Sequence, residues 1–156
     1  MRFEKIEQLT DRQIRDLHNM YQEEWWTKGR ALEDVRSMVE HTDVVVGVCE
    51  AESKRLVAFA RVLTDHVYKA LVLDVIVESG SRGKGLARAL MNAVVGHPSL
   101  SSVRHFELYC RRSSYPCIAS GTSPTNLATS ASCAEWRQVP ASADLTLGVG
   151  SRWRIH

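Results

Sequence analysis

The stretch LDVIVESGSRGKGLARAL, residues 73–90, says more about the fold than any other part of this 156-residue chain. It begins with β-branched and apolar residues around one aspartate, a pattern typical of a strand that ends near Val77. A short polar turn follows, and RGKG (82–85) then opens a segment in which Leu86 and Leu90 recur at helical spacing. The stretch therefore predicts a strand, a turn and a helix.

The turn before this helix carries the residue types that bind an anion. Backbone N–H groups in the first turn of a helix lack an intrahelical acceptor and lie at the positive end of the helix dipole, so they can hold a diphosphate. Gly83 and Gly85 have no Cβ and let phosphate oxygens approach the main chain, while Arg82 and Lys84 add positive charge at the rim. We therefore expect a phosphate-containing ligand here.

Two nucleotide-binding motifs fit this turn less well. A P-loop requires G-x-x-x-x-G-K-S/T, but Lys84 is followed by Gly85. A dinucleotide-binding turn requires G-x-G-x-x-G directly after a strand, whereas Arg88 takes the third glycine position and residues 78–81 intervene. Glu107 lies about twenty residues further on, where a ribose-binding acid occurs, so a nicotinamide-binding protein stays an alternative.

The rest of the chain predicts helices first and strands afterwards. Apolar residues recur at helical spacing after Thr10 or Asp11, either of which can cap the first helix. Three later runs are rich in β-branched residues, and their connections are too short for a crossover helix, so they are expected to form an antiparallel meander. A helix between the last two strands allows one parallel pair. The predicted elements are helices over 10–24, 32–39 and 83–95 and strands over 43–50, 55–63, 67–77 and 104–110.

The pattern Arg82-x-x-Gly85-x-Ala87, after a strand and opening a helix, resembles the acetyl-coenzyme A motif Arg/Gln-x-x-Gly-x-Gly/Ala of the GNAT superfamily of N-acetyltransferases. The predicted order of elements over residues 10–110 is similar to that superfamily as well. The resemblance implies an α/β (α+β) fold, a GNAT-like mixed, mostly antiparallel sheet flanked by helices. It also implies acetyl-CoA as cofactor and direct transfer of acetyl to a primary amine.

The cofactor-binding residues are carried over from this resemblance. The main chain of Ile76 and Val77 would hydrogen-bond the pantetheine arm of acetyl-CoA. The amides of residues 82–87, which include Leu86 and Ala87, would hold the diphosphate. The side chains of Ile76, Val77 and Leu86 are also of the kind that fills a hydrophobic core.

Three residues are candidates for the acceptor side. In this superfamily the end of the first predicted helix borders the acceptor pocket, and here it carries Glu24, Trp25 and Trp26. Trp25 continues the apolar stripe and is expected in the core, which leaves Trp26 as the pocket candidate and Glu24 at an acidic rim that attracts a cation. Asp74 lies among apolar residues, where a carboxylate needs a partner. It either orients or activates an amine or hydrogen-bonds a neighbouring loop.

The general acid stays unassigned. The family commonly supplies a tyrosine that protonates the departing thiolate, in a stretch resembling P-x-x-x-P-F-Y-x-K-x-G-F. That stretch is absent as written, and Tyr115 stands about three positions before the expected place. The alternative function is therefore a catalytically impaired acyl-CoA-binding or regulatory module of the same fold.

Residues 111–156 differ in composition from residues 1–110, since 18 of them are Ser, Thr, Gly or Pro. If the third base of each codon from Arg111 is joined to the first two of the next, the degenerate code permits Pro-Glu-Leu-Val-Pro-Leu-Tyr-Arg-Lys-Trp. This is close to the missing stretch, and we hypothesise that residues 111–156 are read out of frame. The chain is thus divided into an acetyltransferase core, 1–110, and an atypical tail, 111–156.

Composition excludes several other classes. The chain is 44% hydrophobic and 24% charged, which is ordinary for one soluble domain. No run approaches the roughly 20 apolar residues that cross a bilayer, and no signal peptide is visible, so a cytoplasmic location without a membrane partner is expected. The four cysteines form no metal-binding spacing. Residues 1–110 hold 15 Lys and Arg against 16 Asp and Glu, without a basic stripe for nucleic acid. The expected partners are a small-molecule or peptide amine and, as one allowed assembly, a second copy in a homodimer.

Overall fold

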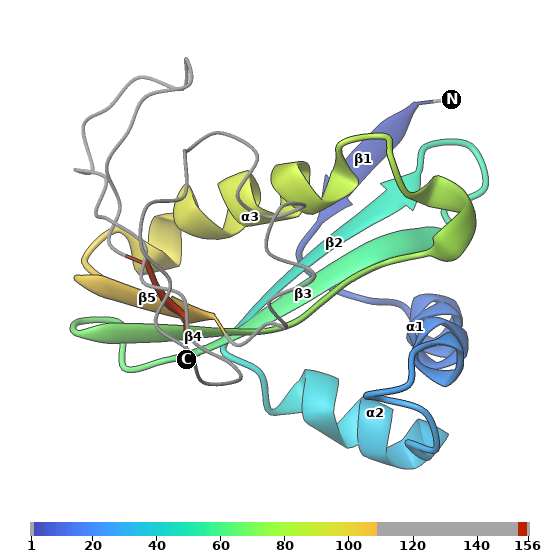
Figure 1. The fold of residues 1–156 in the computed structure, drawn as a ribbon, viewed down its shortest axis with the longest axis horizontal. Coiled ribbons are helices and arrows are strands. Elements are labelled where there is room, and N and C mark those ends of the chain that lie inside the picture. Colours follow the sequence, from blue (N-terminus) through green and yellow to red (C-terminus); the bar gives the residue numbers. More distant parts are fainter. Residues whose placement is uncertain (1, 109–152, 156) are drawn as a thin grey trace, which may run out of the picture.

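The computed structural model describes residues 2–108 and 153–155, which form one mixed sheet with helices on both faces (Figure 1). Among these residues, the strands of the sheet follow chain order from β1 to β6. Strands β1 to β4 pair antiparallel, and the β4–β5 and β5–β6 pairs are parallel. The strands are β1 (Phe3–Ile6), β2 (Val44–Glu50), β3 (Leu56–Thr64), β4 (Lys69–Val77), β5 (His105–Leu108) and β6 (Trp153–Ile155), and the helices are α1 (Asp11–Glu23), α2 (Leu32–Glu40) and α3 (Leu86–Val95).

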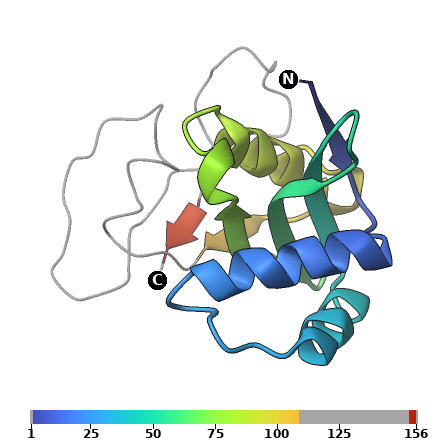
Figure 2. The same cartoon turned by 90° about the vertical axis from the view of Figure 1, so that its right-hand side faces the viewer.

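The sheet separates two hydrophobic cores. Helix α3 covers one face, and α1 and α2 cover the other, with α1 crossing the strands (Figures 1 and 2). Leu90 and Val94 of α3 are fully buried in the first core, and Leu17 and Tyr21 of α1 are fully buried in the second. Strand β2 is apolar and buried along nearly its whole length because helices cover both of its faces.

Helix α1 begins after Thr10, one of its two predicted caps. The Thr10 hydroxyl accepts a hydrogen bond from the Gln13 backbone N–H at 3.3 Å, and the Gln13 side chain accepts one from the Thr10 backbone N–H at 2.9 Å. The helix ends at Glu23, and the following turn leaves Trp25 62% exposed. The expectation that Trp25 lies in the core is therefore wrong, because the helical stripe stops before it.

The predicted antiparallel meander is confirmed, and its last strand contains a bulge. Phe59 pairs with Ile76 and Arg61 with Leu73, so two residues of β4 lie opposite one residue of β3. Asp74 is within this bulge and has a φ of 52°, a left-handed value that few residues other than glycine adopt. A backbone of this kind persists where surrounding contacts hold it.

The predicted parallel pair is confirmed as β4 and β5, which pair over residues 69–72 and 105–108. Helix α3, which lies between them in the chain, begins at Leu86 rather than at residue 83. The preceding turn contains the 3₁₀ helix η1 (Ser79–Ser81) and two glycines with left-handed φ values, Gly83 and Gly85. These φ values interrupt the helix that the apolar spacing alone predicted.

Strand β1 was not predicted from the sequence, because FEKI is short and half charged. It pairs antiparallel with β2. The approach is close at Gly47, where a Cβ atom would lie 2.9 Å from Cγ1 of Ile6. The neighbouring strand thus explains the one glycine within the apolar run of β2.

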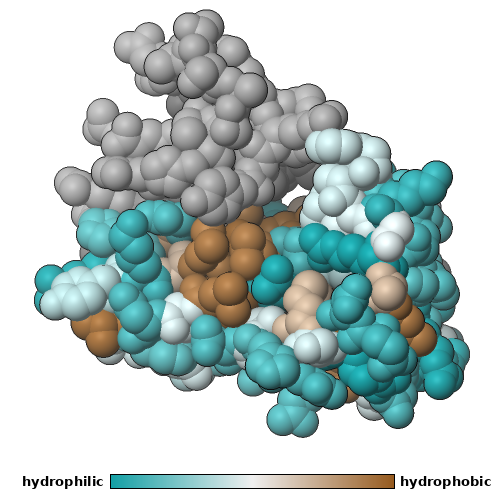
Figure 3. All heavy atoms as spheres, turned by 90° about the horizontal axis from the view of Figure 1, so that it is seen from below, coloured by the Kyte–Doolittle hydropathy of each residue, from teal (hydrophilic) through white to brown (hydrophobic). Residues whose placement is uncertain are grey.

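Seen from the side of α1 and α2, the surface is largely hydrophilic over these helices and carries an apolar patch beside them (Figure 3). On the chain as far as residue 108, no helix is both long and apolar enough to cross a membrane. Apart from β6, the tail lies outside the described residues, and so do Tyr115 and the stretch on which the reading-frame hypothesis depends.

Candidate active site

The loop between β4 and α3 presents open main chain. Gly83 and Gly85 have φ values of 76° and 79°, and a Cβ atom added at either would meet no atom within 4 Å. Gly85 is the N-cap of α3, and its position supplies no side-chain cap to the first turn. The N-cap thus leaves the first amides of α3 without a side-chain acceptor, which is the arrangement that anion-binding helix starts use.

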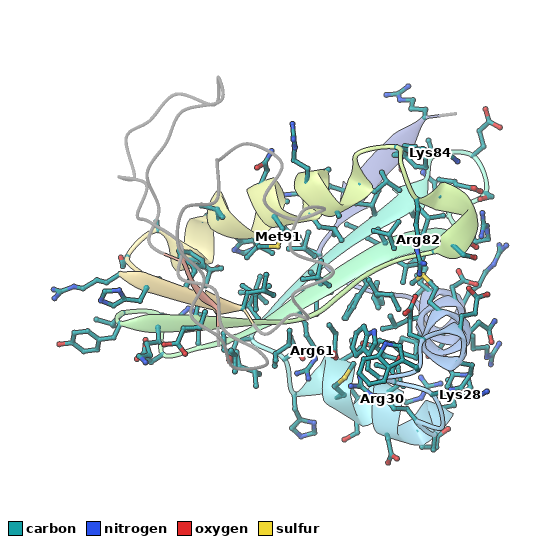
Figure 4. The ribbon with its side chains drawn as sticks, in the orientation of Figure 1. Lys28, Arg30, Arg61, Arg82, Lys84 and Met91 are labelled. Carbon is teal, nitrogen blue, oxygen red and sulfur yellow. The ribbon has the colours of Figure 1, made fainter. Side chains whose placement is uncertain are left out.

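Two cationic side chains belong to this loop. Lys84 and Arg82 come from the loop itself, on the side where α3 begins (Figure 4). Lys84 Nζ donates to the carbonyl of Gly80 at 3.3 Å, which folds the loop back on itself. Residues 82–87, which the sequence predicts to hold a diphosphate, thus lie together at the start of α3, and we call this segment the cradle.

The edge of β4 next to this cradle is the second part of the site. The ladder with β3 extends to the pair Ala58–Val77, but the ladder with β5 ends at Val72–Leu108 among the described residues. The side chain of Ile76 is buried on the α1 face, and that of Val77 packs against the core under α3. Both side chains thus fill core space, and the side of this main chain that faces away from β3 has no strand partner among the described residues.

Arg82 connects the cradle to the end of α1. Its guanidinium forms an ion pair with the carboxylate of Glu24, and its Nε donates to the carbonyl of Val77 at 3.1 Å. One residue earlier in α1, the carboxylate of Glu23 accepts from the hydroxyl of Ser79 at 3.1 Å. The structure therefore brings Glu24, predicted on the acceptor side, into direct contact with Arg82, predicted on the cofactor side.

Asp74 is the most heavily bonded carboxylate of the site. Its Oδ2 accepts from Nε of Arg61 at 2.7 Å, Nη1 of Arg30 at 3.0 Å and the hydroxyl of Tyr21 at 3.1 Å. Burial raises the pKa of Asp74, but its bonds to Arg30 and Arg61 outweigh burial and hold that pKa below its usual value. These ion pairs stabilise the fold at neutral pH, and this contribution is lost as the pH falls through the lowered pKa.

The Asp74 contacts bear on both interpretations of this residue. Arg30 lies in the connection between α1 and α2, so the carboxylate does bond a neighbouring loop. Burial, together with the adjacent Asp74, raises the pKa of Tyr21 far above its usual value, so the phenol stays protonated and donates. The action of Asp74 on an amine stays a prediction.

Trp26 lies beside this network and is 37% exposed. Its ring meets that of Tyr21 edge to face, with centroids 6.4 Å apart. The guanidinium carbon of Arg30 lies 4.6 Å from the centroid of Tyr21 and 6.0 Å from that of Trp26. Trp26 is therefore partly exposed to solvent while its ring contacts Tyr21 and Arg30.

The family follows from comparison of the whole chain with known proteins. The model of the acetyltransferase (GNAT) family matches residues 5–119. The chain belongs to the GNAT family of acetyltransferases. The GNAT family uses acyl-CoA donors. These donors contain the two groups predicted from the sequence for this site, a diphosphate and a pantetheine arm.

Curated relatives of this GNAT protein match it over part of their length. A serotonin N-acetyltransferase 2, chloroplastic, from Oryza sativa subsp. japonica is 40% identical over 82 residues, which cover 51% of this chain and 41% of the relative. A GCN5-related N-acetyltransferase 1, chloroplastic, from Arabidopsis thaliana is 31% identical over 71 residues, 46% of this chain and 36% of the relative. The chain thus spans about two-fifths of the length of these relatives.

Crystal structures show the same fold. A GNAT-family protein from Xanthomonas campestris pv. campestris superposes with a TM-score of 0.66 at 28% identity, covering 80% of this chain and 87% of that one. The glucosamine-6-phosphate N-acetyltransferase of Arabidopsis thaliana gives a TM-score of 0.62 at 17% identity, covering 83% and 97%. The mixed, mostly antiparallel GNAT-like sheet expected from the sequence is therefore confirmed.

Sequence reasoning missed the partners of Asp74. Arg61 is in the predicted strand over 55–63, and the register of β3 and β4 sets it beside the bulge. A buried aspartate inside a strand signals a cationic partner, but the register is needed to identify it. Tyr21 comes from α1 and Arg30 from the connection between α1 and α2, and neither carries a sequence signal for this contact. Within residues 2–108, no cluster of three His, Cys, Asp or Glu side chains is arranged to hold a metal.

Proposed function

We propose that this GNAT protein transfers an acetyl group from acetyl-CoA directly to a primary amine. The observation that carries the proposal is the cradle, in which two left-handed glycines precede the start of α3, next to the segment of β4 that has no partner on the β5 side among the described residues. In this proposal the amides of residues 82–87 hold the diphosphate, with Arg82 and Lys84 at its rim. The main chain of Ile76 and Val77 holds the pantetheine arm.

Acetyl-CoA, when bound, supplies a thioester: the amine nitrogen forms the new C–N bond, the C–S bond breaks, one proton leaves the amine and one joins the thiolate. The chain's own residues contribute chiefly by placing two substrates together, which removes much of the entropic barrier. A main-chain N–H near Val77 polarises the thioester oxygen. The general base and the general acid are left unassigned.

The acceptor is proposed to be a cationic amine. Trp26 is partly exposed in the turn after α1, and Glu24, at the end of α1, is ion-paired with Arg82 of the cradle. The Oryza relative is named for serotonin, which makes an arylalkylamine a reasonable first probe. The cytoplasmic location and the homodimer stay predictions, and both curated relatives above are named chloroplastic.

The second candidate is an acyl-CoA-binding module without turnover. It is favoured by the missing tyrosine stretch, since residues 111–156 as written do not contain the family pattern. Sequencing the DNA that encodes this tail distinguishes a shifted frame from a genuine tail. A displaced frame that cannot spell the tyrosine stretch ends the reading-frame hypothesis.

Turnover is tested by following free thiol released from acetyl-CoA. The amine panel contains serotonin, spermidine, glucosamine 6-phosphate and a peptide with a free N-terminus. Thiol release that depends on one of these amines, with the acetylated product identified by mass spectrometry, supports the proposed reaction. If acetyl-CoA raises the melting temperature but no amine releases thiol, the binding-module function is correct instead.

The Glu24–Arg82 pair makes a sharper prediction about the cofactor. Glu24→Gln is expected to strengthen acetyl-CoA binding about twofold to fivefold, because an exposed ion pair contributes up to about 1 kcal/mol and its loss frees the Arg82 guanidinium. Glu23→Gln is the matched control. It removes the same charge from the preceding residue, whose carboxylate bonds Ser79. Titration calorimetry with acetyl-CoA measures both, and equal changes in the two variants contradict a specific role for the pair.

A further inference from the structure

One carboxylate joins four parts of this molecule. Asp74 lies in the bulge of β4, and its three donors come from α1 (Tyr21), from the connection between α1 and α2 (Arg30) and from β3 (Arg61). The Asp74 side chain is 6% exposed and that of Arg61 is 15% exposed. Bonds this well shielded from water are stronger than those on the surface.

Arg30 is held at both its main chain and its side chain. Its backbone carbonyl accepts a hydrogen bond from Nε2 of Gln22 in α1 at 3.0 Å. Its guanidinium bonds Asp74 through Nη1 at 3.0 Å and through Nη2 at 3.4 Å, and it lies over the ring of Tyr21. The connection between α1 and α2 is thereby fastened to β4 through one side chain.

The backbone of Asp74 depends on the same bonds. Its φ of 52° costs about 1–2 kcal/mol for a residue with a Cβ atom, and aspartate and asparagine tolerate it better than most. The bulge immediately precedes Ile76 and Val77, whose main chain is proposed to hold the pantetheine arm. The carboxylate thus links the shape of the cofactor strand to the position of the loop beside Trp26.

We propose that Asp74 is a positioning residue, whose carboxylate fixes the α1–α2 connection against the β4 bulge and so sets the amine in line with the acetyl group. This inference rests on the proposed acetyl transfer. In this role Asp74 acts through its bonds to Arg30 and Arg61. A misplacement of about 1 Å can cost on the order of 100-fold in rate, so a fixed distance between the two sides of the site matters.

Asp74→Asn is the variant that tests this role. Asparagine keeps the shape and tolerates the left-handed backbone, but it removes the charge that holds two guanidiniums. We expect kcat for the best amine of the panel to fall about 10-fold to 100-fold, within the range set by such misplacement, while the Kd for acetyl-CoA changes less than about threefold. Hydrogen exchange of the amides of residues 24–31 is expected to accelerate at least about tenfold, since the side-chain anchor of the connection is lost.

Asp65→Asn is the matched control. The Asp65 carboxylate accepts from the backbone N–H groups of Val67, Tyr68 and Lys69 in the β3–β4 turn, so this variant removes the same charge from a carboxylate with a similar number of bonds elsewhere. We expect it to leave kcat and the exchange of residues 24–31 unchanged. All measurements are made well below the melting temperature, so that kcat refers to folded protein.

The outcomes separate this inference from the proposed reaction. Unchanged hydrogen exchange of residues 24–31 in Asp74→Asn overturns the inference. Faster exchange with kcat within twofold of the wild-type value also overturns it, because the Asp74 bonds would then be purely structural. A wild-type protein that binds acetyl-CoA but acetylates no amine refutes the acetyl transfer. The positioning role falls with it, and the exchange experiment then decides only whether Asp74 holds the connection.

Discussion

Gly85→Asp is expected to weaken acetyl-CoA binding by the folded protein about 100-fold. Gly85 caps α3 with a φ of 79°, and its main chain lies open at the centre of the proposed diphosphate cradle. An aspartate there places a negative charge where the diphosphate would lie. Repulsion of about 3 kcal/mol corresponds to a loss of roughly 100-fold in affinity. Titration calorimetry with acetyl-CoA measures the effect.

Gly29→Asp provides the control for strain and charge. Gly29 also has a left-handed φ, 93°, and a Cβ atom added there would meet nothing within 4 Å. The substitution therefore carries a similar backbone cost and the same added charge, but in the α1–α2 connection rather than at the start of α3. The account of the cradle is contradicted if both variants bind acetyl-CoA equally well, or if both lose binding to the same extent.

Phe59→Ala is expected to produce the largest loss of stability. Phe59 is fully buried in the core between α1 and the sheet, and it pairs with Ile76 at the end of β4. Truncating a buried phenylalanine costs about 3–5 kcal/mol, a large part of the roughly 5–15 kcal/mol that keeps a domain folded. Urea unfolding followed by circular dichroism measures the change in the free energy of unfolding.

Leu63→Ala is the comparison for this core prediction. Leu63 lies four residues along β3 on the same face but is 37% exposed, so its truncation is expected to cost less than about 1 kcal/mol. The prediction that Phe59 is central to the core is contradicted if the two variants lose a similar free energy of unfolding. A Phe59→Ala protein that stays folded is also expected to bind acetyl-CoA more weakly. Ile76 of β4, proposed to hold the pantetheine arm, loses the side chain of its partner on β3.

Local patterns predicted most of the fold. The meander of β2, β3 and β4 follows from β-branched runs joined by short connections, and the parallel β4–β5 pair follows from the intervening α3. Strand β1 was missed because four residues with two charges carry no clear alternation, and only the edge of β2 makes them a strand. Trp25 was misplaced because the end of α1 depends on the turn after Glu23.

The candidate site divides in the same way. The cradle could be predicted from the sequence because its glycines and cations are neighbours in the chain, just before a predicted helix. The link between Glu24 and Arg82 and the bonds of Asp74 join residues more than forty positions apart, apart from the Arg61 contact. Register, the bulge and the end of α1 set these contacts, and none of the three can be obtained from spacing along the chain.

Titration of the 156-residue chain with acetyl-CoA, with NADH as the comparison ligand, tests the central claim most directly. The account predicts saturable binding of acetyl-CoA at one site, and no binding of NADH at the same concentrations. Saturable binding of NADH in place of acetyl-CoA, or no heat of binding with acetyl-CoA, would contradict the claim that residues 82–87 and the edge of β4 form an acyl-CoA site.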